Sequence, residues 1–267
     1  MRTRKTAPND IPALKALWQE AFEDTQQDID TFFETLYPTA TGFCAEEDGE
    51  ILSMLFALPQ TIVKDEKQCR AAYLYAVATK KAARGRGLCR AVFACAEKEL
   101  RKRYVEALLL SPASEQLAEF YARLGFARQT GAKKVLLPCD RAQGQANEIG
   151  VQDYAGLRET ILWDIPHVRY DKAQLEYAVS GGKFYSLLAG YNMGCAAVQA
   201  GKDGTQAFVC ELLPDDQGIS ALAEKLGTGK YEVLSALEEA GETWSMLKWL
   251  AKPDADLEPV YMGFALE

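Results

Sequence analysis

Residues 73–90 read Tyr-Leu-Tyr-Ala-Val-Ala-Thr-Lys-Lys-Ala-Ala-Arg-Gly-Arg-Gly-Leu-Cys-Arg, and this stretch decides the fold. Its apolar first half is typical of a strand, and the helical spacing of apolar residues over 87–104 predicts a helix directly after it. Glycines at 85 and 87 allow the backbone to approach a ligand with its amides pointing one way. Because a helix start adds partial positive charge, the loop suits a pyrophosphate. The surrounding cations are Lys80, Lys81, Arg84, Arg86 and Arg90.

A glycine pair also occurs in ordinary tight turns between a strand and a helix, so the loop alone leaves both interpretations open. The neighbouring residues narrow the choice of nucleotide-binding motif. Neither G-x-x-x-x-G-K-[ST] nor G-x-G-x-x-G is present in this loop, which excludes a Walker loop and a dinucleotide fingerprint.

The loop resembles the signature of the GCN5-related N-acetyltransferase (GNAT) family, R/Q-x-x-G-x-G/A. Residues 84–89 read Arg-Gly-Arg-Gly-Leu-Cys and fit it, except that Cys89 replaces the last small residue. Residues 114–126, Ser-Glu-Gln-Leu-Ala-Glu-Phe-Tyr-Ala-Arg-Leu-Gly-Phe, echo the family motif N-x-x-A-x-x-x-Y-x-x-x-G-F and depart from it at Ser114 and Leu117. The two motifs stand in the family's order and spacing, so the resemblance covers residues 1–138.

The resemblance implies an α/β (α+β) GNAT fold, with a mixed, mostly antiparallel sheet flanked by helices, over residues 1–138. It also implies an enzyme that uses acetyl-CoA as a cosubstrate and no metal. In such an enzyme an amine attacks the thioester carbonyl directly, so both substrates must be oriented. By family position, the residues expected to hold acetyl-CoA are Val77, Ala78, Thr79, Arg84, Gly85, Arg86, Gly87, Leu88, Cys89 and Ser114.

Tyr121 is, by family position, the candidate acid for the coenzyme A thiolate. The alternative is that Tyr121 packs with Leu117 and Leu124 as an ordinary helix aromatic. The base is harder to find, because the strand at 71–79 contains no Asp or Glu, although relatives often place a carboxylate there.

A sub-group of the family, the acetyltransferases of the enhanced-intracellular-survival type, suggests a base. The chain resembles them in Val-Ala-Thr at 77–79 and Arg-Gly-Arg-Gly-Leu at 84–88, and these relatives use their C-terminal carboxylate. Residues 260–267, Val-Tyr-Met-Gly-Phe-Ala-Leu-Glu, alternate like a strand. The resemblance therefore implies that Glu267 enters the site as the base, and a plain edge strand is the alternative.

Residues 139–150, rich in Gln, Gly, Asn and Asp, have the composition of a linker. Beyond them, residues 151–267 predict helices at 151–163, 171–179 and 219–226 and strands at 184–188, 195–199, 207–213, 231–234, 246–250 and 260–265. This order partly repeats the first half, which predicts a second, smaller, degenerate GNAT-like domain. Residues 214–218 read Pro-Asp-Asp-Gln-Gly where a second basic loop would stand. We therefore expect this domain to complete the acceptor site and to bind no acetyl-CoA.

The charge is unevenly distributed along the chain. Residues 1–138 carry 20 basic and 18 acidic side chains, whereas residues 139–267 carry 10 and 20. This balance argues against a nucleic-acid partner, which needs a clustered basic surface. The acidic second half would attract a cationic amine acceptor, and solubility is the simpler alternative.

The cysteines and the single histidine indicate the cellular compartment and the kinds of catalytic site that the chain can form. Seven cysteines without a C-x-x-C pair predict reduced thiols in the cytoplasm. No apolar run approaches the roughly 20 residues needed to span a bilayer, so we expect no membrane contact. The single histidine, His167, argues against serine triads and zinc sites. We expect it at the surface or at a helix cap, and a triad through it stays open.

The sequence therefore predicts a cytoplasmic N-acyltransferase that moves an acetyl group from acetyl-CoA to a primary amine of a small molecule or peptide. The alternative is a non-catalytic acyl-CoA-binding sensor or structural protein, favoured by the missing strand carboxylate and by Ser114. The acceptor, the acyl chain length and the oligomeric state, a homo-oligomer included, stay open.

Overall fold

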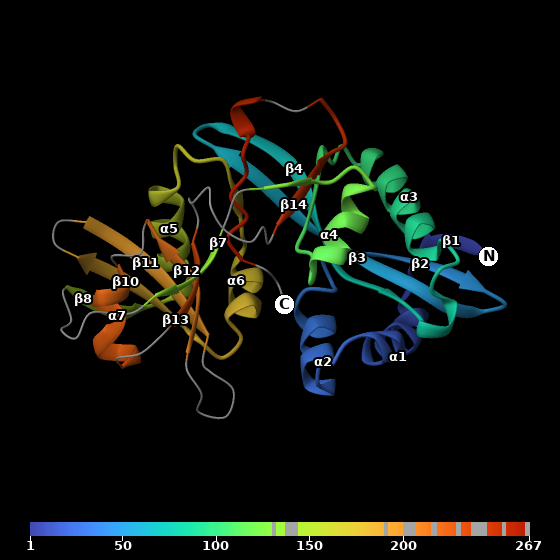
Figure 1. Ribbon diagram of the computed structural model, residues 1–267, viewed down its shortest axis with the longest axis horizontal. Coiled ribbons are helices and arrows are strands. Elements are labelled where there is room, and N and C mark those ends of the chain that lie inside the picture. The colour runs from blue at the N-terminus through green and yellow to red at the C-terminus, as the bar shows by residue number, and fades with distance from the viewer. Residues whose placement is uncertain are drawn as a thin grey trace.

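The structure is a computed structural model that describes residues 1–129, 132–136, 144–189, 192–199, 207–214, 218–227, 231–235, 245–252 and 255–264. Within these residues the strands form two sheets, one of eight strands and one of six. Figure 1 shows the two sheets with helices α5 (Val151–Ile161) and α6 (Lys172–Val179) between them.

The first sheet runs in the order β1-β2-β3-β4-β5-β14-β6, and β9 pairs with β3 beside this path. All neighbouring pairs are antiparallel except β4 and β5, which are parallel. This is the mixed, mostly antiparallel sheet that the sequence predicts. Its strands are β1 (Arg2–Lys5), β2 (Thr41–Glu47), β3 (Glu50–Lys64), β4 (Lys67–Thr79), β5 (Ala107–Leu110), β6 (Ala127–Arg128), β9 (His167–Arg169) and β14 (Met246–Trp249).

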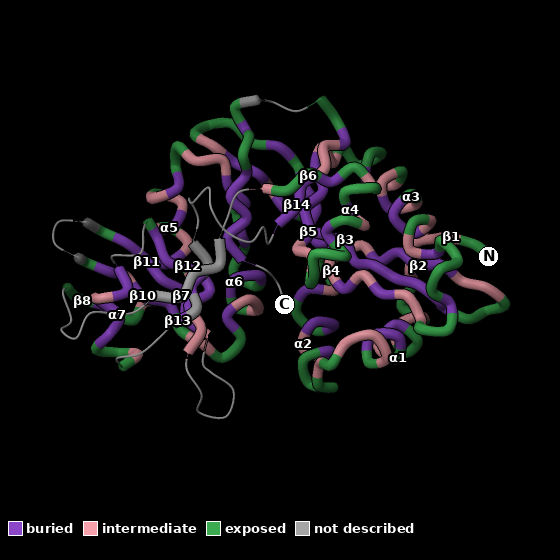
Figure 2. The backbone as a smooth tube through the Cα atoms, viewed as in Figure 1, coloured by how far each residue is buried: buried purple, intermediate pink, exposed green. Residues whose placement is uncertain are grey.

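Helices cover both faces of the first sheet because its central strands are apolar on both sides. On β3, Phe56 belongs to the core of one face and its neighbour Leu55 to the core of the other, since side chains alternate along a strand. Helices α1 and α2 pack on the Phe56 face, and α3 and α4 pack on the Leu55 face. Figure 2 shows β3 buried along most of its length. The helices and 3-10 turns of this part are η1 (Pro8–Asp10), α1 (Ile11–Ala21), α2 (Gln26–Thr35), η2 (Lys81–Ala83), α3 (Leu88–Arg101) and α4 (Glu115–Ala122).

The second sheet runs in the order β7-β13-β12-β11-β10-β8, and only β12 and β13 are parallel among its described pairs. Helix α7 packs on one face and α5 on the other, because Ala196 and Cys195 of β11 point to opposite cores. The remaining elements are β7 (Ala132–Leu136), β8 (Gln145–Ile149), β10 (Lys183–Ala189), β11 (Asn192–Gln199), β12 (Phe208–Leu213), α7 (Gly218–Leu226), β13 (Tyr231–Ser235) and η4 (Ala255–Leu257).

The two sheets exchange strands across the predicted boundary between residues 1–138 and 151–267. Strand β7 pairs with β13 in the second sheet, whereas β14 lies between β5 and β6 in the first. Strand β9 likewise pairs with β3. Hydrophobic periodicity identifies a strand but does not specify its partner, so the sequence contains no visible sign of this exchange.

Two local predictions are wrong. The expected linker at 139–150 contains β8, a strand at the sheet edge whose exposed polar residues Gln145, Asn147 and Glu148 resemble loop composition. Residues 260–264, expected as a strand, form one β-bridge, between Tyr261 and His167. Side-chain hydrogen bonds to this backbone take the place of a strand ladder.

Candidate functional site

The candidate site lies where β4 and β5 separate. Their parallel pairing ends at Tyr73, whereas β4 continues to Thr79. Before its end β4 also bulges: its register against β3 shifts between Met54 and Phe56, and Ala76 takes a φ of +47°. A bulge bends the strand and leaves backbone groups unpaired. Together the two features open the sheet beside Ala76.

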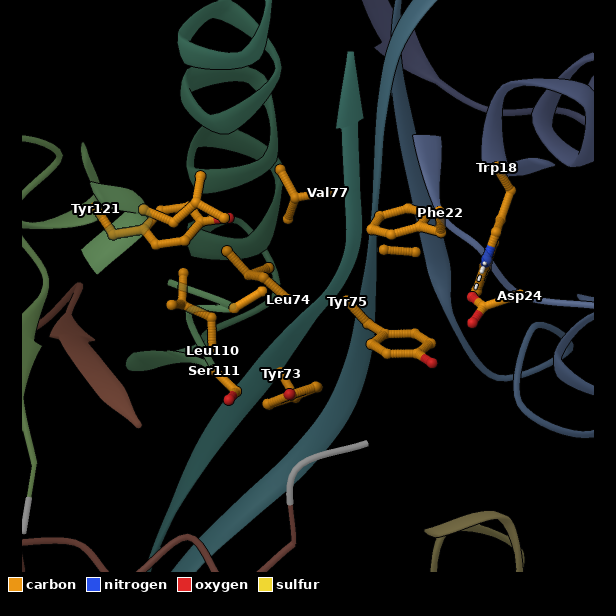
Figure 3. Close-up of a pocket in the computed structure, with 13 residues that line it drawn as sticks. Trp18, Phe22, Asp24, Tyr73, Leu74, Tyr75, Val77, Leu110, Ser111 and Tyr121 are labelled. Atoms are coloured by element: carbon orange, nitrogen blue, oxygen red, sulfur yellow. Dashed lines mark hydrogen bonds between the residues drawn. The ribbon is translucent and has the colours of Figure 1, made fainter. Parts of the chain in front are cut away.

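A cavity of about 290 Å³ occupies this opening. Its walls come from the end of α1 and the following loop, from β4, from the segment after β5 and from α4. Figure 3 shows Tyr121 on one side of β4 and Phe22 and Tyr75 on the other. The cavity therefore connects the two faces of the sheet.

The glycine loop follows β4 and leads into α3. Gly85 and Gly87 have φ angles of +77° and +79°, and beyond the adjacent residues no heavy atom lies within 4 Å of the place of a Cβ at either. The first hydrogen bond of α3 runs from Ala91 N to Gly87 O, so the amides of residues 88–90 have no acceptor within the helix. Open space, free amides and a helix N-terminus fit the predicted pyrophosphate.

Carboxylates already contact several cations of this loop. Arg86 Nη2 lies 2.6 Å from Glu47 Oε2, and Lys80 pairs with Glu50, both acids belonging to the β2–β3 hairpin. The hydrogen bond from Arg86 lowers the pKa of the Glu47 carboxyl, which keeps it charged at neutral pH. Arg84 Nε donates to a backbone oxygen, Thr79 O, at 3.3 Å. Phosphate oxygens at Arg86 or Lys80 would therefore compete with carboxylates.

The other residues expected to bind the cofactor divide between the cavity and its support. Val77 lines the cavity. Ser53 Oγ donates to Ala78 O at 2.8 Å and lies 2.9 Å from Thr79 Oγ1, which fixes the end of β4. Leu88 is buried in the core under α3, and burial raises the pKa of the Cys89 thiol to about 12.

Ser114 is the N-cap of α4. Its Oγ accepts a hydrogen bond from Leu117 N at 3.3 Å, as serine does at many helix starts. Its neighbours Ala113 and Leu117 line the cavity. The structure thus gives Ser114 a role in positioning α4, and its expected contact with the cofactor stays a prediction.

Tyr121 lies on α4 and is 5% exposed. Its ring packs between Phe93, Phe120 and Phe126, with centroids 5.4 to 6.1 Å away. No described residue forms a hydrogen bond with its hydroxyl, and the side chain lines the cavity. Burial raises the pKa of Tyr121, so its hydroxyl stays protonated at neutral pH. Both sequence interpretations therefore hold, since Tyr121 packs as a helix aromatic and also faces the cavity.

The opposite wall of the cavity is aromatic and carries one acid. Trp18 Nε1 donates to Asp24 Oδ2 at 2.7 Å, whereas Asp24 Oδ1 has no partner among the described residues. The Trp18 ring lies 5.9 Å from Phe22 and 5.6 Å from Tyr75, measured between centroids. Trp18 and Phe22 recur at helical spacing with Leu14 and Leu17, so the sequence predicts them only as apolar positions of a helix. Nothing in the sequence pairs Asp24 with them, because the chain must turn after α1 to bring it back.

One residue of the second half of the chain reaches this wall. Tyr177 Oη on α6 lies 3.0 Å from Tyr75 Oη on β4. Helix α6 is held against the first sheet by Gln174, whose Nε2 donates to Pro59 O at 3.1 Å. The acidic loop at 214–218 falls partly outside the described residues.

Two further predictions concern single residues. Glu267, the expected base, lies outside the described residues. His167 was expected at the surface or at a cap, but it is 2% exposed on β9, with Nδ1 2.7 Å from Ile165 O and Nε2 3.2 Å from Glu159 Oε1. The pairing of β9 with β3 buries it, and this pairing is invisible in the sequence.

Within the described part of the chain, no group of three or more His, Cys, Asp or Glu side chains is placed to hold a metal ion. No helix in that part is long and apolar enough to cross a membrane.

Comparisons with known proteins agree with this geometry. Residues 2–128 match the family model of the acetyltransferase (GNAT) domain. A GCN5-related N-acetyltransferase from Anabaena variabilis is similar in structure, with a TM-score of 0.71 at 14% identity over 93% of this chain and 73% of its own. One from Kribbella flavida has a TM-score of 0.70 at 14% identity over 94% and 72%. Eis1 from Mycobacterium abscessus has a TM-score of 0.65 at 12% identity over 94% and 74%.

These structural likenesses show a shared fold that extends over nearly the whole chain. None of the curated proteins matches the sequence. The family match covers the glycine loop, and it also covers the bulged strand β4 and Tyr121, which line the cavity. The match assigns residues 2–128 to a GNAT acetyltransferase domain.

Proposed function

We propose that the chain transfers an acetyl group from acetyl-CoA to a cationic primary amine of a small molecule or peptide in the cytoplasm. The observation that carries this proposal is the cavity, which joins Tyr121 on one face of the sheet to Asp24 on the other. A two-substrate transfer needs such a connection, because the thioester and the amine must meet from different sides.

The donor side suits acetyl-CoA. The amides of residues 88–90 and the open glycines would take the pyrophosphate, and the acyl arm would lie along the gap between β4 and β5. The bulge at Ala76 leaves backbone groups of β4 beside Val77 available for the thioester carbonyl. The described cysteines form no disulfide, which agrees with the proposed reducing compartment.

The acceptor side suits an ammonium group. Aromatic faces and a carboxylate are the groups that attract cations, and Trp18, Phe22 and Tyr75 surround Asp24. Asp24 Oδ1 is available to accept a hydrogen bond, because Trp18 binds the other oxygen. The acidic second half of the chain would draw such an amine toward the site.

In the reaction the amine nitrogen attacks the carbonyl carbon, the new C–N bond forms and the C–S bond breaks. The leaving sulfur needs a proton or a hydrogen bond, and Tyr121 is placed to provide it. Burial raises the pKa of Tyr121 above its usual value of about 10, whereas a thiol has a pKa of about 8.5. Tyr121 therefore stabilises the thiolate chiefly by donating a hydrogen bond, and full transfer of its proton is uphill.

The bound ammonium group must lose a proton before the attack, because only the neutral amine has a lone pair, and the second proton of the nitrogen ends on the leaving sulfur. The strand β4 carries no carboxylate over 71–79 to accept the first proton. We propose that the terminal carboxylate of Glu267 takes this proton. A chain extended by two residues after Glu267 would then bind acetyl-CoA and lose turnover.

Thiol release from acetyl-CoA tests the proposed function, with a panel of cationic, neutral and anionic amines. We expect release with cationic primary amines, and an Asp24→Asn variant should raise the KM for the amine and leave that for acetyl-CoA unchanged. Glu23→Gln, the removal of an exposed neighbouring charge, is the matched control. Acetyl-CoA binding without release on any amine would contradict the proposal and support the sensor alternative.

A further inference from the structure

The position of the Tyr121 hydroxyl depends on the helix that carries it. No described residue forms a hydrogen bond with this hydroxyl, so its place in the cavity follows from the packing of the ring and from the backbone of α4. Helix α4 has only eight residues, and a helix of that length is stable only through its contacts with the rest of the protein. The contacts at the end of α4 therefore decide where Tyr121 lies.

The chain closes the end of α4 in a Schellman motif, and Tyr121 takes part in it. Phe126 N donates to Tyr121 O at 3.1 Å. Gly125 N donates to Ala122 O at 2.9 Å, and the φ of Gly125 is +90°, as the motif requires at this place. The apolar contact that accompanies the motif joins the rings of Tyr121 and Phe126, whose centroids lie 6.1 Å apart. The Tyr121 ring is thus packed against the end of its own helix.

Lys248 on β14, outside the residues of the family match, holds this helix end. Its Nζ donates to Leu124 O at 2.7 Å and lies 5.8 Å from the centroid of the Phe126 ring, within the range of a cation–π contact. The last carbonyls of a helix have no donor within it, and the helix dipole favours a positive charge beside them. Figure 1 shows β14, in red, beside the green helix α4. Lys248 therefore caps α4 from a strand far along the chain.

The same ammonium group also pairs with Glu97 on α3. The side-chain exposures of Lys248 and Glu97 are 18% and 20%, so water screens the pair only in part. Helix α3 begins at the glycine loop, and its Phe93 ring lies 5.8 Å from the Tyr121 ring between centroids. Lys248 thus connects the helix that starts at the proposed pyrophosphate site with the helix that carries Tyr121.

The backbone of Lys248 is fixed by the two strands on either side of β14. Lys248 lies opposite Leu108 of β5, and its neighbour Leu247 lies opposite Ala127 of β6. Met246 belongs to the core under α3 and α4, and side chains two residues apart on a strand point to the same face. The Lys248 side chain therefore reaches α4 from a strand that is paired along both edges.

We infer that Lys248 is a positioning residue for acyl transfer, which acts by fixing the end of α4 and, through it, the Tyr121 hydroxyl. This role rests on the proposed function of Tyr121 as the hydrogen-bond donor to the leaving sulfur. A group displaced by about 1 Å from its reacting geometry costs on the order of 100-fold in rate. Lys248 does not line the cavity, so its loss lowers turnover and leaves the binding of both substrates unchanged.

The test compares Lys248→Met in the unmodified chain and in a Tyr121→Phe chain. Methionine keeps an unbranched apolar stem and removes the ammonium group. In the unmodified chain we expect kcat to fall about tenfold, because Tyr121 is displaced but still present, with both KM values and the acetyl-CoA Kd unchanged. In the Tyr121→Phe chain, Lys248→Met should cause no further fall, because the hydroxyl that it positions is gone.

Lys5→Met is the matched control. Lys5 is also a strand lysine that pairs with an acid of α3, its Nζ lying 3.3 Å from Glu99 Oε2, but β1 stands at the opposite edge of the sheet from β6 and α4. This change should leave kcat unchanged in both chains.

The inference is overturned if Lys248→Met leaves kcat unchanged, or if it lowers kcat equally in both chains, as a purely structural residue would. Loss of acetyl-CoA binding by Lys248→Met would also overturn it, because Lys248 would then support the whole fold. Full turnover of the Tyr121→Phe chain would remove both Tyr121 and Lys248 from the mechanism, whereas absence of thiol release in the unmodified chain would overturn the proposed function.

Discussion

The hydroxyl oxygens of Tyr75 and Tyr177 lie 3.0 Å apart, although Tyr75 belongs to β4 in the first half of the chain and Tyr177 to α6 in the second half. Burial raises the pKa of Tyr177 to about 12 and that of Tyr75 well above its usual value. Both hydroxyls are therefore neutral at physiological pH, and one donates to the other. A residue of the cavity wall is thus held by a contact from the second half of the chain.

This hydrogen bond predicts that Tyr177→Phe weakens binding of the amine and leaves binding of acetyl-CoA unchanged. Loss of a hydrogen bond worth about 1 kcal/mol would loosen Tyr75 and raise the KM for the amine about fivefold. The KM for acetyl-CoA should not change. Tyr104→Phe, on an exposed tyrosine, is the control in steady-state kinetics with both substrates varied. Equal changes in the two KM values would contradict the role of Tyr177 in the wall.

Tyr121→Phe should lower kcat by at least about 100-fold, the usual cost of removing one hydrogen-bond donor to a developing anion. The ring remains, so its packing on Phe93 and Phe126 is kept and the melting temperature should not move. Single-turnover thiol release measures the effect on chemistry. A variant that retains full turnover would remove Tyr121 from the mechanism and leave it only its packing role.

Gly87→Ala should weaken acetyl-CoA binding about tenfold. A side chain at a φ of +79° is strained by about 1–2 kcal/mol, which favours a loop conformation unsuited to the phosphate. Isothermal titration measures the Kd. Gly156→Ala is the matched control, because Gly156 lies on α5 with free space around its Cβ position. That change should stabilise the helix by up to about 1 kcal/mol and leave the Kd unchanged.

Glu211→Gln should destabilise the fold by about 3–5 kcal/mol, because it leaves the Arg158 guanidinium buried without its counter-charge. Urea unfolding followed by circular dichroism measures the loss. Glu224→Gln, on the exposed side of α7, should stay within about 0.5 kcal/mol of the unmodified protein. Similar stabilities for the two variants would show that the buried pair does not stabilise the fold.

The environment of Glu159 predicts that the stability of the fold decreases at acid pH. Burial alone would raise the pKa of its carboxyl, but hydrogen bonds from His167 and Arg169 outweigh this and lower the pKa from 4.5 to about 2. The folded form thus binds the proton less readily than the unfolded form. The stabilisation is fully present above about pH 5 and is lost as the pH falls toward 2.

Urea midpoints measured from pH 7 to pH 3 test this dependence. Glu159→Gln should flatten the decline, while Glu176→Gln, on an exposed acid of α6, should leave it as steep as in the unmodified protein. A decline that Glu159→Gln does not alter would place the acid sensitivity in other carboxylates.

The part of the site whose residues lie close together in the sequence could be predicted. The glycine loop and Tyr121 stand within one run of the chain, and their spacing and residue types carry the information. The aromatic wall of the cavity was not predictable, because Asp24, Tyr75 and Tyr177 come together only after α1, β4 and α6 have packed.

Part of the fold could likewise be predicted from the sequence, and part could not. The order of helices and strands follows from periodicity, and the mixed sheet follows from the family resemblance. Strand β8 was not predicted because most of its residues are polar, and β9 was not predicted because it has only three residues. The burial of Arg158 and Glu211 was not predicted either, because charged residues usually lie at the protein surface unless a partner is known.

The exchange of β7 and β14 has a consequence for how the protein is made. During synthesis the first sheet lacks the strand that belongs between β5 and β6 until residue 249 has emerged. Until then β5 presents an open, apolar edge to the cell, a surface on which other chains can add. The half of the molecule that contains the glycine loop is therefore synthesised first, but its sheet is completed only when the chain is almost finished.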